Sequence, residues 1–306
     1  MNKPKITVIG SINMDLVTVT PTLPNVGETV LGSQFSTIPG GKGANQAVAA
    51  ARLGADVTMI GCVGKDVFGQ ELLAHLKKEG VNIDNVEPVT HKETGTASIT
   101  IANGDNSIIV VQGANNEVTS SFIKEKEELI ATSDILLLQL EIPIETVEAA
   151  AKIAQQNGVR VILNPAPIQP LSQQLVNAVD FITPNEHELS VLLDQKERLE
   201  TIKEKLVITK GAEGISYFDN GKEVTVPSFQ VDVIDTTGAG DTFNGAFAVA
   251  LSNDFSLEGA CQFGAAAGAL SVTKLGAQSG MPTLEELSNH WCLSPPEFCR
   301  KTLMTK

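Results

Sequence analysis

The sequence predicts an α/β protein built around a mostly parallel sheet, with a smaller β-sheet outside that main layer. Two observations lead to this fold class. Short apolar runs alternate with helical segments through the middle of the chain, and two β-rich segments without a convincing helix interrupt the alternation. The chain has 306 residues, 42% of them hydrophobic and 19% charged, so it can bury a full core as one large domain, with or without a small appendage.

The alternation is clearest after residue 133. Residues 134–140 form an apolar run that is too short for a helix of its own and suits a strand buried on both faces. Helical spacing over residues 144–157 ends at Gly158, and another apolar strand covers residues 159–163. The elements expected next are a helix near 171–178, a strand at 181–183, a polar helical stretch and a strand at 206–209. Strands and helices at this spacing predict right-handed βαβ units.

Two segments depart from the alternation. Residues 15–35 and 94–111 combine β-branched residues with turn residues, and the second suggests a hairpin around the Asn-Gly pair at 103–104. We expect both to form a small sheet that could act as a lid. The α/β domain is then expected to comprise residues 1–14, 36–93 and 112–290, and residues 291–306, which show little periodicity, to form a peripheral tail.

Composition and charge exclude several classes of function. A net charge of -14 leaves nothing to neutralise a run of phosphates, so no nucleic-acid partner is expected. No apolar stretch reaches transmembrane length and no signal peptide is apparent, so no membrane partner is expected. The four cysteines form no CxxC pair, which favours reduced thiols and a cytoplasmic protein, with a redox role as the weaker alternative.

The strongest candidate site is the segment DTTGAGDTFNG at residues 235–245. Gly238, Ala239 and Gly240 precede an apolar helix, so bare backbone N–H groups would lie at its N-terminus and could bind a phosphate or a developing oxyanion. Asp241 would sit in the first turn. It could be a capping acid, or a general base that takes a proton from a substrate hydroxyl during phosphoryl transfer.

A second glycine-rich segment, PGGKGANQA at residues 39–47, also leads into a helix. Gly41 would permit close approach of a ligand, while Lys42 and Asn45 supply donors for sugar hydroxyls. A purely structural turn is the competing interpretation. The segment is not a Walker A loop, because the GxxxxGK[ST] spacing is absent, and Gly10-Ser11-Ile12-Asn13 lacks the GxGxxG of a dinucleotide site.

Polar residues follow several predicted strands, where α/β sheets bind their ligands. Asn13 and Asp15 follow the first strand, and Asp15 could accept two hydrogen bonds from a diol. Glu141 ends the strand at 134–140. Asn185 and Glu188 follow the strand at 181–183 and could hold the water shell of Mg²⁺. A turn acid for Asp15 and an exposed helix residue for Glu188 are the structural alternatives. The Gly-rich turn from Thr209 to Gly214 is placed to border a nucleotide.

Two of these segments resemble the signature motifs of the ribokinase family, also called the phosphofructokinase-B family. They are GGKGANQA at 40–47 and DTTGAGDTFNG at 235–245, and two long motifs in this order are highly specific. Shorter segments resemble the same family: GSINMD at 10–15, LQLE at 138–141, NPAP at 164–167 and KLGAQ at 274–278. The resemblance runs from about residue 5 to about residue 285.

The resemblance implies a Rossmann-like three-layer domain with a β-sheet lid that also makes the contacts of a homodimer. It implies phosphorylation of D-ribose at its 5-hydroxyl by ATP, with Mg²⁺ and an activating monovalent cation, usually potassium. Asp241 matches the catalytic base, and Gly238, Ala239 and Gly240 match its anion hole.

The remaining site residues are carried over by the same matches. The positions that match ribose contacts are Asn13, Asp15, Gly41, Lys42, Asn45 and Glu141. Those on the nucleotide side are Asn185, Thr209, Gly211 and Gly214, with Glu188 in an NxxE motif near Mg²⁺. The monovalent-cation site is matched by Asp235, Thr237, Ser271, Lys274, Gly276 and Gly280, several of them through backbone carbonyls.

Two alternatives stay open at the level of sequence. A sibling kinase would act on deoxyribose, a nucleoside or another sugar, and deoxyribose is the hardest to exclude because it differs by one hydroxyl. A ligand-binding protein that has lost turnover is the second. The stretch between Asn185 and Thr209 is shorter than the family usually has, which keeps that interpretation open although both flanking motifs are intact.

Overall fold

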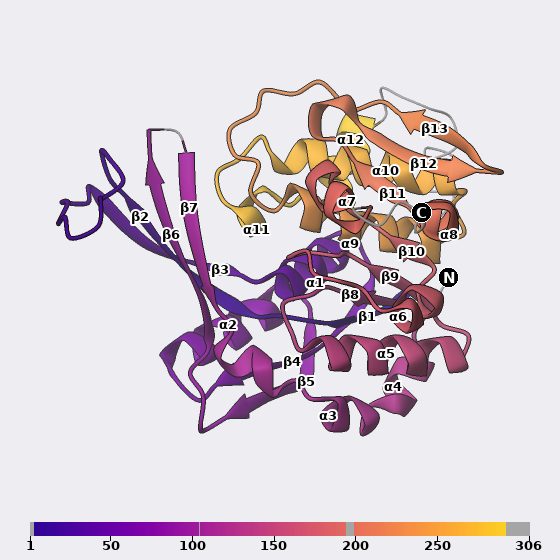
Figure 1. Cartoon of the computed structure of the whole chain (residues 1–306), viewed down its shortest axis with the longest axis horizontal. Helices are drawn as coiled ribbons and strands as arrows, with labels where there is room; N and C mark the ends of the chain where they lie inside the picture. Colours follow the sequence, from indigo (N-terminus) through magenta and orange to yellow (C-terminus); the bar gives the residue numbers. More distant parts are fainter. Residues whose placement is uncertain (1–2, 104, 194–198, 292–306) are drawn as a thin grey trace.

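The computed structural model describes residues 3–103, 105–193 and 199–291 (Figure 1). A central sheet is covered by helices on both faces, and a second sheet projects away from this body on one side (Figure 1). The predicted fold class is therefore confirmed. The expected tail falls almost entirely on residues 292–306, which lie outside the described residues, as does Gly104 of the expected hairpin turn.

The central sheet has six strands in the order β10-β9-β8-β1-β4-β5, and each neighbouring pair is parallel. Its strands are β1 (Lys5–Ile9), β4 (Asp56–Gly64), β5 (Asn82–Val89), β8 (Ile135–Leu138), β9 (Arg160–Leu163) and β10 (Phe181–Ile182). Successive side chains of β8 enter different cores, with Leu137 on one face and Leu136 and Leu138 on the other. A strand buried on both faces can be apolar at every position, which is why this run was recognisable in the sequence.

The helices form the two outer layers. On one face, α1 (Lys42–Arg52), α2 (Val67–Lys78), α9 (Ala239–Ser252) and α10 (Leu257–Ser271) contribute to one core cluster. On the other face lie α3 (Ser120–Lys124), α4 (Glu127–Ala131) and α5 (Ile144–Gln156). Short helices complete the chain: η1 (Gly113–Glu117), α6 (Gln173–Ala178), α7 (Glu186–Leu192), α8 (Leu199–Ile202), η3 (Lys203–Lys205), η4 (Gly211–Glu213), α11 (Ala277–Gly280) and α12 (Leu284–Trp291). Within the described ranges, no helix combines the length and apolar character needed to cross a membrane.

The projecting sheet has four strands in the order β3-β2-β6-β7. They are β2 (Asn13–Val19), β3 (Gln34–Gly40), β6 (Gly95–Ala102) and β7 (Asp105–Val111). Strands β2 and β3 pair antiparallel, as do β6 and β7, while β2 and β6 are parallel. The sheet extends beyond the boundaries expected from the sequence, because backbone pairing begins at Asn13 opposite Gly40. It thereby leads directly into the site.

A third sheet was not expected. The strand anticipated at residues 206–209 is β11 (Val207–Thr209), and it pairs antiparallel with β12 (Ile215–Asp219), which pairs with β13 (Lys222–Val226). Only isolated parallel bridges, from Ile182 to Leu206 and from Asn185 to Thr209, link it to the edge of the central sheet. The glycine-rich turn after β11 sends the chain straight back as a hairpin, so antiparallel pairing replaces the expected βαβ continuation.

Candidate active site

The two glycine-rich motifs open helices α1 and α9, and these helices pack unusually closely. A Cβ atom added at Gly245 of α9 would lie 2.7 Å from Ala49 Cβ and 2.8 Å from the Gln46 carbonyl oxygen of α1. Only glycine permits this approach. It brings Asn45 and Gln46 of α1 against Asp241 of α9, although nearly 200 residues of chain separate them (|i−j| 196 and 195).

Asp241 is the centre of the site. Its side chain is 7% exposed, and one carboxylate oxygen accepts a hydrogen bond from Asn45 Nδ2 at 2.9 Å. The other oxygen accepts one from Gln46 Nε2 at 3.1 Å. The carboxylate also borders the large cavity described below. Asp241 therefore does not cap its own helix with its side chain; it is held by a neighbouring helix at the edge of a cavity.

The N-terminus of α9 is open. The helix begins after Gly238, whose φ of 77° and ψ of 2° lie in the left-handed region, and no described side chain caps this end. Gly238, Ala239 and Gly240 all line the same cavity as Asp241. The Ala239 N–H donates to the Thr236 carbonyl oxygen at 3.2 Å, so of the expected anion hole it is the N–H groups of Gly238, Gly240 and Asp241 that can attract an anion at the start of this 14-residue helix.

The residues expected to contact sugar lie where β2, β3 and α1 meet. Asn13 and Asp15 are on β2, and Gly41 and Lys42 join β3 to α1. Glu141 is fixed by Ser11 Oγ, which donates to its Oε2 at 2.5 Å, and by the Lys42 backbone N–H, which donates at 3.2 Å. The structure thus brings together five of the residues that the sequence placed in three separate segments.

Charges interact strongly at this end of the site. Burial, followed by the nearby carboxylates of Glu141 and Asp241, raises the pKa of Asp15 from 3.8 to about 7. Burial opposes the charge on Lys42, but the surrounding carboxylates, Asp241 first, outweigh it and raise the Lys42 pKa. Burial also raises the pKa of Glu188. A single buried cation among several carboxylates suits a ligand that is rich in hydroxyl groups.

A cavity of about 850 Å³ extends from this cluster. The expected nucleotide residues Asn185, Thr209, Gly211 and Gly214 line it together with Glu188. Asn185 caps α7 by accepting a hydrogen bond from the Glu188 backbone N–H, and the Glu188 side chain accepts one from the Asn185 N–H, both at 2.8 Å. Apolar side chains also contribute to the lining, among them Ile215, Phe229, Val231, Val233, Phe243, Ala265, Ala269 and Val272. This size and mixed lining fit a nucleotide.

The expected cation-site residues surround a turn that joins α10 to α11. The Asp235 carboxylate accepts hydrogen bonds from the Thr237 N–H at 2.9 Å, the Thr237 hydroxyl at 2.7 Å and the Gly276 N–H at 2.8 Å. These bonds outweigh the effect of burial and lower its pKa, so it stays anionic. A Cβ atom at Gly280 would lie 2.1 Å from the Ser271 carbonyl oxygen, which shows how closely these two backbones approach.

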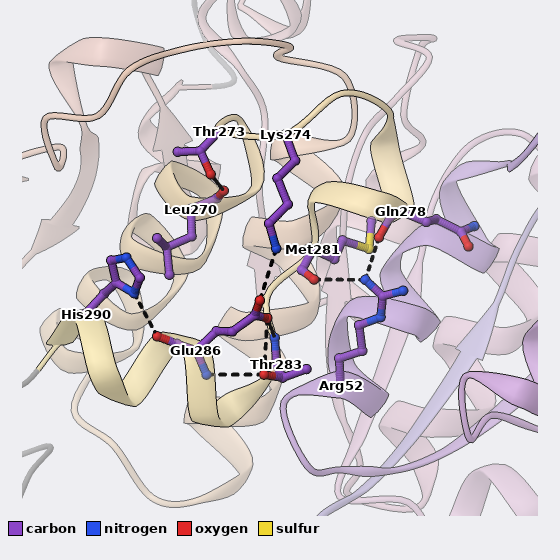
Figure 2. A network of polar contacts seen from close by, with 9 residues as sticks. All are labelled: Arg52, Leu270, Thr273, Lys274, Gln278, Met281, Thr283, Glu286 and His290. Carbon is purple, nitrogen blue, oxygen red and sulfur yellow. Dashed lines mark hydrogen bonds and ion pairs between the residues drawn. The ribbon is translucent and has the colours of Figure 1, made fainter.

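Lys274 forms an ion pair with Glu286, in which Lys274 Nζ lies 3.0 Å from Glu286 Oε1. Figure 2 shows the two side chains pointing toward one another. Arg52 donates to the carbonyl oxygens of Gln278 and Met281 at 2.6 and 2.8 Å, and so anchors α11 to α1 (Figure 2). At position 274 only the backbone carbonyl remains available for a cation.

Comparison with known proteins identifies the family. Residues 3–284 match the pfkB family of carbohydrate kinases. The chain belongs to that family. It is 51% identical to a ribokinase of Bacillus subtilis over 285 residues, covering 92% of this chain and 97% of the relative. It is 47% identical to a ribokinase of Lactococcus lactis, covering 92% and 95% of the two chains.

Solved structures agree. A structure of Arabidopsis thaliana ribokinase complexed with ribose and ATP matches this pfkB kinase with a TM-score of 0.86 and 33% identity, covering 94% of this chain and 98% of the other. Thermotoga maritima ribokinase matches with a TM-score of 0.85 and 36% identity, over 94% and 98% of the two chains. The family resemblance found in the sequence motifs is confirmed, and so is the carbohydrate-kinase class.

Several polar residues of this kinase's site were not singled out in the sequence. Gln46, Asn164 and Gln278 are buried and hydrogen-bonded around Asp241 and Asn45, and Asn115 donates to Asn13 Oδ1 at 2.7 Å. Three of them lie inside the recognised motifs. The sequence feature that could have identified them is an uncharged amide side chain within a motif. This feature is a weak indicator of a site residue, because most amide side chains are solvent-exposed.

The donor groups fit the metal ions that the family implies. Among the described residues, no three His, Cys, Asp or Glu side chains form a metal site. Mg²⁺ bound through nucleotide phosphates and water needs only one or two protein carboxylates, which Glu188 can provide. The all-oxygen donor set around Asp235, with one carboxylate, a hydroxyl and backbone carbonyls, fits a hard monovalent cation.

Proposed function

We propose that this protein transfers the terminal phosphoryl group of ATP to the 5-hydroxyl of D-ribose, giving D-ribose 5-phosphate. The observation that carries the proposal is the position of Asp241. Its carboxylate borders the cavity beside the uncapped N-terminus of α9. Relatives that are 42–51% identical bear the name ribokinase, and a matching structure holds ribose and ATP.

In the proposed mechanism, Asp241 acts as general base. It accepts the proton of the 5-hydroxyl as that oxygen attacks phosphorus, and Asn45 and Gln46 keep the carboxylate oriented. The backbone N–H groups of Gly238, Gly240 and Asp241 stabilise negative charge on the transferring group, whereas that of Ala239 donates to the Thr236 carbonyl oxygen at 3.2 Å. Base and anion hole belong to one helix turn, so a ligand that reaches one also reaches the other.

The sugar would be held at the junction of β2, β3 and α1. Asp15, once ionised, accepts two hydroxyls, and Lys42 and Asn45 donate to others, with Asn13, Gly41 and Glu141 completing the contacts. The Asn115 side chain donates a hydrogen bond to Asn13 Oδ1, so the NH₂ group of Asn13 would face the ligand. The nucleotide would contact Asn185, Thr209, Gly211 and Gly214.

Both metal ions are part of the proposal. Mg²⁺, held by ATP oxygens and by water near Asn185 and Glu188, would neutralise phosphate charge when bound. A potassium ion would be held by Asp235, Thr237 and the carbonyls of Ser271, Lys274, Gly276 and Gly280. By occupying this turn it would order the residues that precede α9.

The four-stranded sheet is proposed as a lid that excludes water and as the contact of a homodimer. Its outer strand β7 exposes Ile108, Ile109, Val110 and Val111, an apolar row suited to burial against a second copy. Sedimentation equilibrium tests the dimer, and a monomer at micromolar concentration would contradict it. We place the enzyme in the cytoplasm, where Cys62 and Cys261, both free buried thiols, would stay reduced.

The alternatives are less well supported. Deoxyribokinases of Salmonella are 36% identical to this chain, against 51% for the Bacillus ribokinase. The short segment after α7 does not disturb the flanking residues, because Asn185 and Thr209 form a bridge and both line the cavity. That geometry argues against a protein that has lost turnover.

The test is ADP release from MgATP with D-ribose, deoxyribose or no sugar, with and without potassium, for wild type and Asp241→Ala. We expect ribose-dependent turnover that the substitution lowers by about 10²–10⁴. If deoxyribose supports turnover and D-ribose does not, the assignment of ribose as the substrate is overturned. If folded wild-type protein releases no ADP with any sugar, the proposal that it is a sugar kinase is overturned.

A further inference from the structure

Two chains of buried side-chain amides converge on the Asp241 carboxylate, one on each oxygen. We propose that Gln46 and Gln278 are positioning residues. In each chain every amide donates towards Asp241, and Gln46 and Gln278 maintain this direction so that only NH₂ groups face the Asp241 carboxylate. The inference rests on the proposed role of Asp241 as base. It concerns residues that do not themselves carry out the reaction.

The first chain begins directly after strand β8 of the central sheet. Gln139 Nε2 donates to Gln46 Oε1 at 2.7 Å, and Gln46 Nε2 donates to one Asp241 oxygen at 3.1 Å and to Asn164 Oδ1 at 3.2 Å. Gln46 and Gln139 are both fully buried. Neither belongs to the described residues that line the cavity, so they contact Asp241 from outside the cavity.

The second chain begins at the half-buried His75 on α2. His75 Nε2 lies 2.7 Å from Gln278 Oε1, and since that oxygen has no proton to give, the imidazole is the donor. Gln278 Nε2 then donates to Asn45 Oδ1 at 2.8 Å, and Asn45 Nδ2 donates to the second Asp241 oxygen at 2.9 Å. The chain thus runs from His75 to Asp241 through two amides.

The ionised carboxylate sets the direction of both chains. A carboxylate only accepts, so Asn45 and Gln46 must each turn an NH₂ group towards it and an oxygen away. Those oxygens then require donors, which Gln278 and Gln139 supply. A reversed amide would place two acceptor oxygens together at the next link. Reversing the following amide would relieve that contact but move it one link further, until an amide oxygen faced Asp241.

The direction of the first chain explains why one buried oxygen atom, Gln139 Oε1, has no hydrogen-bond partner among the described residues. Turning the Gln139 amide would place this oxygen against Gln46 Oε1, another acceptor. The unpaired atom is therefore the end of a chain whose orientation is fixed at Asp241, and such atoms are rare enough to require an explanation.

Position 278 offers a test that separates orientation from packing. In Gln278→Glu the side chain keeps its shape and can still accept from His75, but it presents an acceptor to Asn45. Asn45 must then reverse its amide and turn its oxygen towards Asp241. In Gln278→Met the position is filled by an apolar group and Asn45 is free to keep its orientation. Packing alone predicts that Glu is tolerated better; the directional chain predicts the opposite.

Two further variants add no charge. Gln46→Met removes the donor to Asp241 while leaving the proposed sugar contacts untouched. His75→Leu frees the amide of Gln278 at the far end of the second chain. Thr146→Val on α5 is the control, because the Thr146 hydroxyl is also fully buried and donates to the Val118 carbonyl at 2.7 Å, and neither residue belongs to these chains.

The experiment measures kcat, the ribose KM and the thermal midpoint for these five variants, with wild type and Asp241→Ala. We expect kcat to fall about tenfold or more in Gln46→Met with little change in KM, and further in Gln278→Glu than in Gln278→Met. His75→Leu should lower kcat by about two- to threefold, and Thr146→Val should change only the midpoint.

The outcomes distinguish this inference from the proposed function. If Asp241→Ala keeps wild-type kcat, Asp241 is not the base and both fall. If Asp241→Ala is inactive while Gln46→Met keeps wild-type kcat, or while Gln278→Glu is as active as wild type, the base assignment stands and the positioning role is overturned. A kcat that merely follows the thermal midpoint across all variants, Thr146→Val included, also overturns it.

Discussion

The six-stranded and the four-stranded sheets treat their apolar residues in opposite ways. Strand β8 of the first is buried at all four positions, while β7 of the second is exposed along its whole length. The apolar residues of β8 pack against both helical layers. Those of β7 are exposed and belong to neither core cluster of the described residues. Stability therefore resides in the central sheet, and the projecting sheet is free to serve closure and association. The proposed active site lies where the two sheets meet.

The largest expected effect is a difference in the free energy of unfolding between a substitution in β8 and one in β7. Leu137→Ala in β8 removes a fully buried side chain that contacts the core, and it should lower the free energy of unfolding by about 2–5 kcal/mol. Ile109→Ala in β7 changes a side chain that is 67% exposed and should cost about 0.5 kcal/mol or less. Denaturant unfolding at low protein concentration measures both. Equal losses would show that the projecting sheet contributes to the core.

A second test concerns the junction, where a functional charge is buried. Because burial raises the pKa of Asp15 from 3.8 to about 7, the ionised form is disfavoured by folding above pH 4. Asp15→Asn should therefore stabilise the ligand-free protein at pH 8, by on the order of 2–4 kcal/mol. It should also weaken ribose binding by about 10–100-fold, since two hydrogen bonds to a charged group are lost. Thermal unfolding and calorimetric titration with ribose check both signs.

The same carboxyl predicts a dependence on pH. Ribose binding needs the ionised form, so the ribose KM should rise about tenfold as the pH falls from 8 to 6 through the Asp15 pKa of about 7. Folding stability has the opposite slope, because the folded protein binds the extra proton: Asp15 lowers the free energy of unfolding less at pH 6 than at pH 8. Asp15→Asn is the control and should flatten both profiles. An unchanged slope would assign the titration to another group.

The smallest effect is expected at Lys274, beside the proposed cation site. Its side chain pairs with Glu286, whose pKa the Thr283 backbone N–H, together with Lys274, lowers to about 2. Both partners are largely exposed, so Lys274→Ala should change stability by less than about 1 kcal/mol. Potassium activation should be unchanged, because the Lys274 side chain is paired with Glu286 and the proposed contact with the ion is made by the backbone carbonyl. A loss of activation in ADP-release assays would show that the side chain takes part in binding the ion.

Much of the fold and of the site could be predicted from local pattern. The apolar run at 134–140, the helical spacing at 144–157 and the strand at 159–163 correspond to β8, α5 and β9. Their physics is local, since a strand buried on both faces must be apolar throughout. The N-terminus of α9 was predicted for the same reason: a left-handed glycine before an apolar helix needs no distant partner. Motif order supplied the family.

The tertiary structure decided what depends on distant partners. It turned β11 back into an antiparallel sheet, paired Lys274 with Glu286, and raised the pKa of Asp15 by burial among other carboxylates. It also joined Gln278 to Asn45 across 233 positions of sequence, and Asn45 to Asp241 across 196. A sequence shows that an amide is present at each position. Which way that amide points is settled only when the folded chain places a carboxylate at the end of the hydrogen-bond chain.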